Sequence, residues 1–223
     1  MKPLVETDWL NRNLDKVKIF DATWHLPNQK KMAAEEFKKK HIEGSVFFDI
    51  DKHSDKNSKL PHMMPKSFQW KKIVSDFGIS NEDHIIIYDN SDIYSSCRLW
   101  FSFIYFGHNP NLVSVLNGGM KKWVAEDRPL VTEIKETIKS DYKVEELKEF
   151  IIDKKIIDKN IKSKTFDLVD ARSSERFLGK VNEPREGLKA GSIPNSINLH
   201  FKKCLKEDNT FKNVNDLKKI FNS

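Results

Sequence analysis

Two short sequence patterns occur twice in this chain of 223 residues, in the same order. Phe-Asp-Ala at 20–22 returns as Val-Asp-Ala at 169–171, and Ile-Glu-Gly-Ser-Val at 42–46 returns as Ile-Pro-Asn-Ser-Ile at 193–197. From its Asp to its Ser, the first copy measures 24 residues and the second 26. Repetition at nearly constant spacing predicts a duplicated domain.

Strand and helix signals alternate along the first 130 residues, which predicts an α/β domain with a parallel sheet. The polar segment 49–65 has no periodicity and is predicted to be a functional loop. Ser67 and Ser95 are predicted to cap two of the helices. The predicted strands are 17–21, 45–48, 84–88 and 112–116, and the predicted helices cover 31–40, 67–77, the segment after Ser95, and 120–124.

The pattern weakens over residues 126–142, which contain Pro129. We therefore predict a first domain over 1–128, a linker over 129–150 and a partial second domain over 151–223. A helix near 153–161 and a strand over 166–170 open that second domain. In the first copy Ser45 lies 44 residues before Asp89, and the same step from Ser196 leads to position 240. The sequence thus predicts an incomplete second copy.

Composition excludes several classes of protein. The 39 basic and 33 acidic residues are interspersed, so the net charge of +6 indicates a solvated surface, and no nucleic-acid-binding motif is present. No apolar run is long enough to span a membrane, and the N-terminus lacks the apolar region of a secretory signal. Two cysteines are too few for a disulfide scaffold, and they favour a reducing, cytoplasmic location.

Three familiar kinds of site are disfavoured. One His beside two Met, at 62–64, lacks the spacing of a metal centre. Gly118-Gly119 has no phosphate-loop context and predicts a tight turn into a helix. No Gly-x-Ser-x-Gly is present to supply the nucleophile of a serine hydrolase.

Several further motifs, taken in order, resemble the tandem-rhodanese sulfurtransferases, and more closely their 3-mercaptopyruvate sulfurtransferase branch. Together they run from about residue 5 to the C-terminus. The motifs are FKKKHIEGSVFFD at 37–49, Asp-Ile-Asp at 49–51, His-Met-Met-Pro at 62–65, LNGGMKKW at 116–123, Asp-Ala-Arg at 170–172, Arg-Phe-Leu-Gly at 176–179, and Glu-Pro-Arg-Glu-Gly at 183–187.

The resemblance implies a rhodanese-like fold in tandem, each domain an α/β unit with a central parallel sheet flanked by helices. It also implies a nucleophilic Cys in a loop of the second domain, where backbone N–H groups stabilise a persulfide. In the first domain, the residue that matches the position of this Cys is Asp89, and a carboxylate is unable to form a persulfide. The chain's two thiols, Cys97 and Cys204, lie elsewhere.

The same resemblance implies four site residues. Arg176 and Arg185 match the two arginines that bind the substrate's carboxylate or oxyanion, and the second of them favours mercaptopyruvate over thiosulfate. Asp51 and His62 match a pair that works as a proton relay with a Ser of the Cys loop. The alternative for Asp51 and His62 is an ordinary loop hydrogen bond. Arg172, beside Asp170, is expected to be structural.

The function implied by the resemblance is transfer of a sulfane sulfur from 3-mercaptopyruvate or thiosulfate to a thiol or cyanide, with no cofactor. Composition and motif spacing add the expectation of no metal, no nucleic acid and no membrane. We expect the chain itself not to catalyse this, because neither cysteine stands where the persulfide forms. The alternative is a non-catalytic rhodanese module that binds anions or a protein partner. An incomplete second domain exposes a sheet edge, which favours self-association.

Overall fold

The computed structural model describes residues 2–185 and 187–222, so that Met1, Glu186 and Ser223 lie outside the described residues. The chain divides into two compact units, and each is described by itself. Unit 1 comprises Met1–His25 and Gln29–Lys148, and unit 2 comprises Leu26–Asn28 and Glu149–Ser223.

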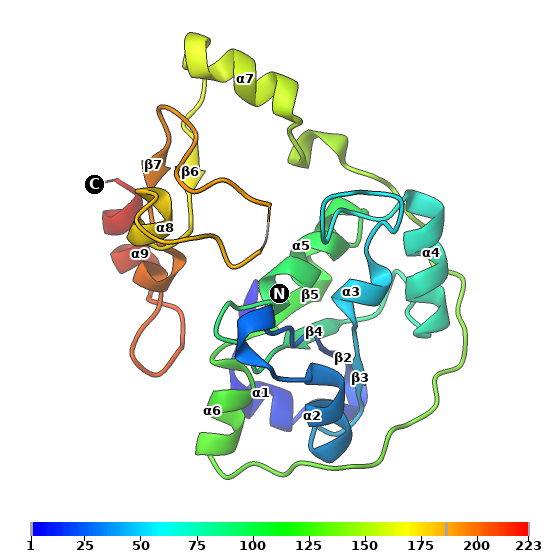
Figure 1. The fold of residues 1–223 in the computed structure, drawn as a ribbon. Coiled ribbons are helices and arrows are strands. Elements are labelled where there is room, and N and C mark those ends of the chain that lie inside the picture. The colour runs from blue at the N-terminus through cyan, green and yellow to red at the C-terminus, as the bar shows by residue number, and fades with distance from the viewer. Residues whose placement is uncertain (1, 186, 223) are drawn as a thin grey trace. The chain divides into compact units, whose positions relative to one another are not determined.

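Unit 1 is built on a five-stranded parallel sheet with the spatial order β1-β5-β4-β2-β3 (Figure 1). Four of its strands confirm the sequence prediction, and the two-residue strand β1 is too short to show a pattern. The strands are β1 (Leu4–Val5), β2 (Lys18–Asp21), β3 (Ser45–Phe47), β4 (Ile85–Tyr88) and β5 (Val113–Leu116).

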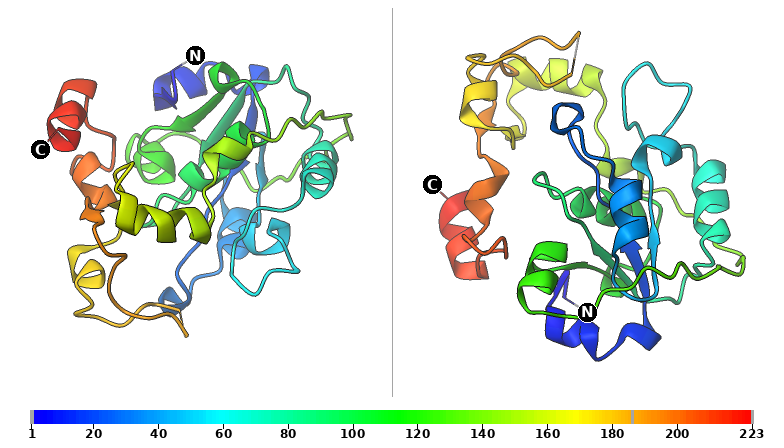
Figure 2. Two further views of the ribbon diagram at one scale, coloured as in Figure 1. Left: turned by 90° about the horizontal axis from the view of Figure 1, so that it is seen from above. Right: turned by 60° about the horizontal axis from the view of Figure 1, so that its bottom comes forward.

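The sheet is buried on both faces, as a parallel sheet requires. Every residue of β4 is buried, since this strand lies in the middle of the sheet. Side chains alternate between the faces: Ile85 and Ile87 belong to one apolar cluster, and Ile86 and Tyr88 to the other. Figures 1 and 2 show helices on both sides of this sheet.

Two helices contribute buried side chains to each face. Trp70 of α4 and Phe103 of α5 cover one face, while Leu10 of α1 and Trp123 of α6 cover the other. The helices of unit 1 are α1 (Thr7–Asn11), α2 (Ala33–Lys39), α3 (Ile50–His53), α4 (Ser67–Asp76), α5 (Ser96–Tyr105) and α6 (Gly119–Ala125).

Two local predictions need correction. The segment 49–65 is not wholly loop, because α3 forms inside it where the Asp49 side chain accepts the backbone N–H of Lys52 at 3.1 Å. Ser67 is the first residue of α4, and its cap position belongs to Lys66. Ser95 is the cap residue of α5, but its hydroxyl makes no capping bond.

The chain from Pro129 to Lys148 packs on unit 1. Val131 forms a bridge with His41, and the fully buried Tyr142 hydroxyl bonds His108 at 3.0 Å. These contacts place much of the stretch predicted as a linker within unit 1. The domain boundaries drawn from the sequence stay a prediction.

Unit 2 contains a two-stranded parallel sheet of β6 (Val169–Asp170) and β7 (Ile197–Asn198). Asp153 caps the first helix, with its side chain accepting the backbone N–H of Ile156 at 3.0 Å. The helices of unit 2 are α7 (Lys154–Ser163), α8 (Ser174–Phe177) and α9 (Val214–Phe221).

The local geometry of β2 and β3 recurs in β6 and β7. Phe20 pairs with Val46 in unit 1, and Val169, its counterpart in the sequence repeat, pairs with Ile197 in unit 2. In both units a Ser at the start of the second strand, Ser45 as the first residue of β3 and Ser196 just before β7, donates its hydroxyl to the backbone carbonyl three residues earlier, at 2.6 Å. The repeated sequence patterns therefore fold into the same local structure.

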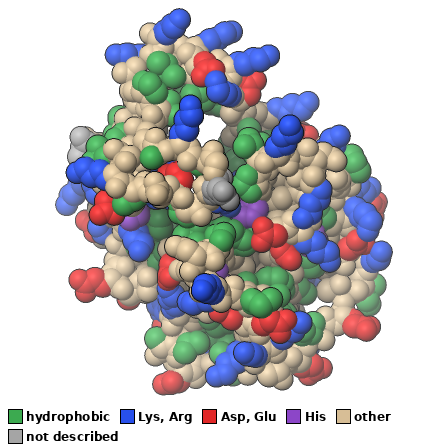
Figure 3. Space-filling view, in the orientation of Figure 1, with side chains coloured by type: hydrophobic (Ala, Val, Ile, Leu, Met, Phe, Trp, Pro, Cys, Tyr) green, Lys and Arg blue, Asp and Glu red, His purple; other side chains and the backbone are tan. Residues whose placement is uncertain are grey.

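On the face drawn in Figure 3, Lys and Arg side chains alternate with acidic ones over unit 1. Within residues 2–185 and 187–222, no helix has both the length and the apolar character needed to cross a membrane.

Candidate active site

The carboxyl ends of the parallel strands meet at one edge of the unit 1 sheet, which is where α/β folds bind ligands. Asp21 ends β2 and Asp89 follows β4. Thr23 joins the two loops, since its backbone and side chain donate to Asp21 and its hydroxyl accepts the Asn90 N–H at 2.9 Å. Burial raises the pKa of Asp21 to about 6.

Gly119 brings the loop after β5 against the same edge. Its φ is +56°, and a Cβ built there would lie 2.6 Å from the carbonyl oxygen of Asp89. The next residue, Met120, donates its backbone N–H to that oxygen at 3.0 Å. The predicted tight turn at Gly118-Gly119 is confirmed, with both glycines in the left-handed region.

Asp51 and His62, both predicted from the resemblance, lie together in unit 1. Asp51 is carried by α3, and His62 by the loop that leads to α4. Nε2 of His62 lies 2.7 Å from Oδ1 of Asp51. The His62 side chain is 16% exposed and that of Asp51 is 66% exposed, so the pair reaches the surface through its carboxylate.

Trp24, on the loop after β2, completes this cluster. Its indole N–H donates to the other carboxylate oxygen of Asp51 at 2.8 Å, and its ring meets that of His62 edge to face at 4.8 Å between centroids. Partial burial raises the pKa of Asp51, but the hydrogen bonds from His62 and Trp24 outweigh it, and the net pKa lies below its ordinary value.

The loop after β4 encloses the carboxylate of Asp89. This buried group accepts the backbone N–H of Ser91 at 2.9 Å, the Ser91 hydroxyl at 3.0 Å, and the backbone N–H of Ser96 at 2.8 Å. Such a ring of donors at a helix N-terminus stabilises an anion. Asp89 supplies that anion from the chain itself.

The two thiols of the chain lie in different units. Cys97 lies in the first turn of α5, where burial and the nearby carboxylate of Asp89 raise its pKa to about 12. A thiol with that pKa is protonated at neutral pH and unreactive. Cys204 ends a short helical turn in unit 2 and is partly buried.

Arg176, in α8, carries a paired guanidinium. Its Nε and one terminal nitrogen donate to the two oxygens of Glu183 at 3.2 and 2.5 Å. The Glu183 side chain is only 3% exposed, and the hydrogen bond from Arg176, followed by the attraction of both neighbouring arginines, lowers its pKa. The carboxylate therefore holds the guanidinium in a fixed plane.

Arg172 also binds Glu183, at 2.7 Å, and it takes Asp170 as a second carboxylate partner at 2.5 Å. These contacts fit the structural role expected for Arg172. Arg185 lies two residues after Glu183 and is partly buried. Glu186, which follows it in the motif, lies outside the described residues.

The sequence motifs assign no role to three residues of these clusters: Trp24, Arg98 and Glu183. Trp24 stands three residues past the end of β2, and that position at a strand end is the signal that marks it. Arg98, from α5, donates to the backbone carbonyl of His62 at 2.6 Å. Nothing local in the sequence marks Arg98 or Glu183 as partners of these groups.

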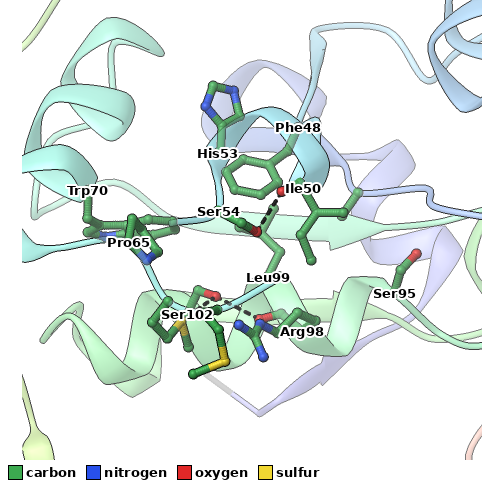
Figure 4. Close-up of a pocket in the computed structure, with 13 residues that line it drawn as sticks. Phe48, Ile50, His53, Ser54, Pro65, Trp70, Ser95, Arg98, Leu99 and Ser102 are labelled. Carbon is green, nitrogen blue, oxygen red and sulfur yellow. Dashed lines mark hydrogen bonds between the residues drawn. The ribbon is translucent and has the colours of Figure 1, made fainter. Parts of the chain in front are cut away.

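A small cavity lies between α3 and α5 (Figure 4). On one side it is lined by Arg98 of α5 and by Ser95, the N-cap of that helix. On the other side it is lined by Ile50 of α3 and by Ser54, which follows that helix. Its volume is about 10 Å³, enough for one water molecule and too small for a sulfur donor. Among the described residues, no group of three His, Cys, Asp or Glu side chains is arranged to hold a metal ion.

Comparison with protein families identifies a known domain in unit 1. The model of the rhodanese-like domain matches residues 6–126. The chain is 33% identical to the 3-mercaptopyruvate sulfurtransferase of Mus musculus over 228 residues, which cover 99% of this chain and 76% of the relative. It is likewise 33% identical to the thiosulfate sulfurtransferase of Rattus norvegicus over 229 residues, with the same coverage of both chains.

Solved structures agree. The structure of SseA from Escherichia coli, described with the rhodanese fold of 3-mercaptopyruvate sulfotransferases, matches with a TM-score of 0.88 at 29% identity. It is covered to 83%, and this chain to 99%. Tum1 of Saccharomyces cerevisiae matches with a TM-score of 0.87 at 28% identity, covering 98% of this chain and 78% of Tum1. The chain belongs to the rhodanese family, alongside the 3-mercaptopyruvate and thiosulfate sulfurtransferases.

Proposed function

We propose that this protein acts in sulfur transfer from 3-mercaptopyruvate or thiosulfate to a thiol or cyanide. The observation that carries the proposal is the similarity to enzymes of both names over 99% of the chain. The residue types at Asp51, His62, Arg176 and Arg185 suit such a reaction, which needs fixed positive charge for an anionic donor and a group that moves a proton.

The proposed reaction uses a cysteine thiolate that attacks the thiol sulfur of 3-mercaptopyruvate or the outer sulfur of thiosulfate. A bond forms between the two sulfurs while the donor's bond to that sulfur breaks. The electron pair leaves with pyruvate enolate, which takes up a proton, or with sulfite. The resulting persulfide passes its outer sulfur to the acceptor and restores the thiolate.

Each site residue has a proposed part in this reaction. Arg176 and Arg185 bind the donor's carboxylate or oxyanion, and Asp51 with His62 delivers the proton that the enolate takes up. The short distance between Asp51 and His62 supports the relay, because a carboxylate orients the imidazole for proton transfer. The ion pair with Glu183 supports the role of Arg176, since it fixes the plane of the guanidinium.

We propose further that the nucleophile is neither Cys97 nor Cys204, so that the 223-residue chain does not turn over a donor by itself. The raised pKa of Cys97 supports this for the first thiol. The position of Cys204, after β7 and not after a counterpart of β4, supports it for the second. The two cysteines are free, as expected of a protein in the cytoplasm, where we place it.

Unit 2 is proposed to be a second copy of the unit 1 fold. The matched register of β6 and β7 with β2 and β3 supports this. In unit 1, β2 pairs with β4 on its other side, whereas among the described residues β6 pairs with β7 alone. We propose that copies of the chain self-associate through this edge of β6, since unpaired edges recruit further strands.

A non-catalytic role in binding anions or a protein is the second candidate. The observation that favours a role without catalysis is the Asp89 loop, whose donors are occupied by a carboxylate of the chain and not by a thiolate. Both candidates predict that the chain by itself binds the donor without gaining its sulfur.

Calorimetric titration of the chain with 3-mercaptopyruvate and with thiosulfate tests the proposed site. We expect binding that weakens at least tenfold in Arg176→Lys and Arg185→Lys, because Lys lacks the planar fork of donors. Arg128→Lys is the matched control, since Arg128 lies in the turn that follows α6 and pairs with Asp8 and Glu126. Equal affinity in all three variants would refute the assignment of both arginines.

A further inference from the structure

The interaction between Asp51 and His62 is expected to be weak, because its carboxylate lies at the surface. Asp51 is the second residue of the four-residue helix α3, and two thirds of its side chain is exposed. Exposed pairs contribute little and leave both side chains free to change rotamer. Proton relay needs one fixed arrangement, so other residues must hold this pair in place.

Trp24 holds the carboxylate. Because Trp24 binds Oδ2 while His62 binds Oδ1, and because the two rings touch, the plane of the Asp51 carboxylate is fixed at both oxygens. An ionised carboxylate only accepts hydrogen bonds, so the hydrogen between Asp51 and His62 resides on Nε2 of His62.

The loop after β4 in turn holds Trp24. The backbone N–H of Trp24 donates to the hydroxyl of Ser95 at 3.1 Å. That hydroxyl lies 3.0 Å from the hydroxyl of Ser91, which binds the carboxylate of Asp89 at 3.0 Å. A continuous chain of hydrogen bonds therefore runs from the Asp89 loop to Asp51.

Arg98 holds the other partner through its backbone. His62 has a φ of +56°, a conformation that costs a non-glycine residue free energy and needs support. Arg98 supplies it through its bond to the His62 carbonyl. Burial lowers the pKa of Arg98, and no carboxylate among residues 2–185 and 187–222 forms an ion pair with it. The hydrogen bond to the His62 carbonyl thus compensates in part for burying the Arg98 guanidinium.

We propose that Trp24 and Arg98 are positioning residues for the proton relay of Asp51 and His62, and that the Asp89 loop anchors Trp24. The proposal rests on the proposed function. It gives this loop a role of its own, because the loop holds the backbone of Trp24, whose indole orients the relay.

Titration of the full chain by nuclear magnetic resonance, without any donor, tests the role of Trp24. In Trp24→Phe, which keeps an aromatic ring but loses the N–H, we expect the pKa of Asp51 to rise and the Nε2–H tautomer of His62 to lose population. Trp100→Phe is the matched control, because the Trp100 indole donates to the backbone of Val113 instead. An unchanged Asp51 titration and an unchanged His62 tautomer in Trp24→Phe would overturn the proposal.

Two further variants keep the test decisive if Trp24→Phe fails to fold. Ser95→Ala removes the acceptor of the Trp24 backbone and should shift the same signals in the same direction, by less. Arg98→Met should broaden the His62 ring signals, and Arg98→Lys, which still donates to the carbonyl, should restore them. Sharp wild-type signals in Arg98→Met would reject the role of Arg98. Failure of sulfur transfer or donor binding would leave these titrations unaffected, which separates this proposal from the proposed function.

Discussion

Nε2 of His62 lies 2.7 Å from Oδ1 of Asp51, although a helix end and a polar loop separate the two residues along the chain. The contact depends on α3, which Asp49 caps, and on the left-handed backbone at His62. Because exposed ion pairs contribute little to stability, we expect this contact to matter more for the proposed relay than for folding.

The first prediction concerns this pair directly. Asp51→Asn should change the free energy of unfolding by no more than about 1 kcal/mol, because exposed ion pairs contribute little. The same substitution should abolish the single Nε2–H tautomer of His62, since an amide is no longer an obligate acceptor. Urea denaturation and nitrogen chemical shifts measure the two effects.

Asp92→Asn serves as the control, since Asp92 is a similarly exposed carboxylate that binds Lys121 instead of a histidine. It should leave the His62 signals unchanged. A loss of several kcal/mol in Asp51→Asn would show that the pair is structural.

Asp21 makes stability depend on pH. Burial raises its folded pKa from 3.8 to about 6, so between those values the folded state binds more protons than the unfolded state. The contribution of Asp21 is therefore full below pH 3.8 and is lost as pH rises through 6. Relative to Asp21→Asn, the wild type should lose about 2–3 kcal/mol between pH 4 and pH 7.

Unfolding by urea at a series of pH values provides this comparison. The Asn side chain retains an oxygen that accepts from Thr23, so the variant keeps the loop contact while removing the titration. A constant difference in stability across the pH range would contradict the raised pKa.

Cys97 should resist alkylation in the folded protein. A pKa raised from 9.0 to about 12 lowers the thiolate fraction at neutral pH on the order of a thousandfold. Mass spectrometry of peptides after timed iodoacetamide treatment should show Cys204 modified well before Cys97, and both modified in urea. Comparable rates for the two thiols in the native chain would refute the burial argument.

Gly119 lies in the turn beside Asp89, and Gly44 serves as its control. Both have positive φ, but a Cβ meets nothing within 4 Å at Gly44 and lies 2.6 Å from a carbonyl oxygen at Gly119. Gly44→Ala should cost about 1 kcal/mol, the penalty of the conformation alone. Gly119→Ala should cost at least about 2 kcal/mol more, because the backbone must move. An equal loss in the free energy of unfolding for the two variants, measured by urea denaturation, would contradict this prediction, because the loop at Gly119 would then accommodate a Cβ without cost.

The main strands of unit 1 could be predicted because their signals are local. The run of apolar residues at 85–88 marks the central strand, since a strand buried on both faces needs such residues throughout. Helix α3 could not be predicted, because a four-residue helix set by one capping bond has no periodicity. The burial of Tyr142 could not be predicted for a related reason: one buried aromatic residue in an irregular segment leaves no pattern in the sequence.

The candidate site could be predicted only in part. Asp51, His62, Arg176 and Arg185 came from the family resemblance, and their roles stay predictions. Trp24, Arg98 and Glu183 depend on contacts between separate elements, such as the bond from Arg98 to His62 across 36 positions. Contacts of this kind follow from the fold and not from local sequence.

The decisive measurement is mass spectrometry of the intact chain after incubation with 3-mercaptopyruvate or thiosulfate. We predict that neither Cys97 nor Cys204 gains a sulfur atom, and that no persulfide passes to an added thiol, although the donor binds at Arg176 and Arg185. A sulfur atom gained at either cysteine, together with turnover that disappears when that cysteine is replaced by Ser, would contradict the proposed absence of the nucleophile from this chain.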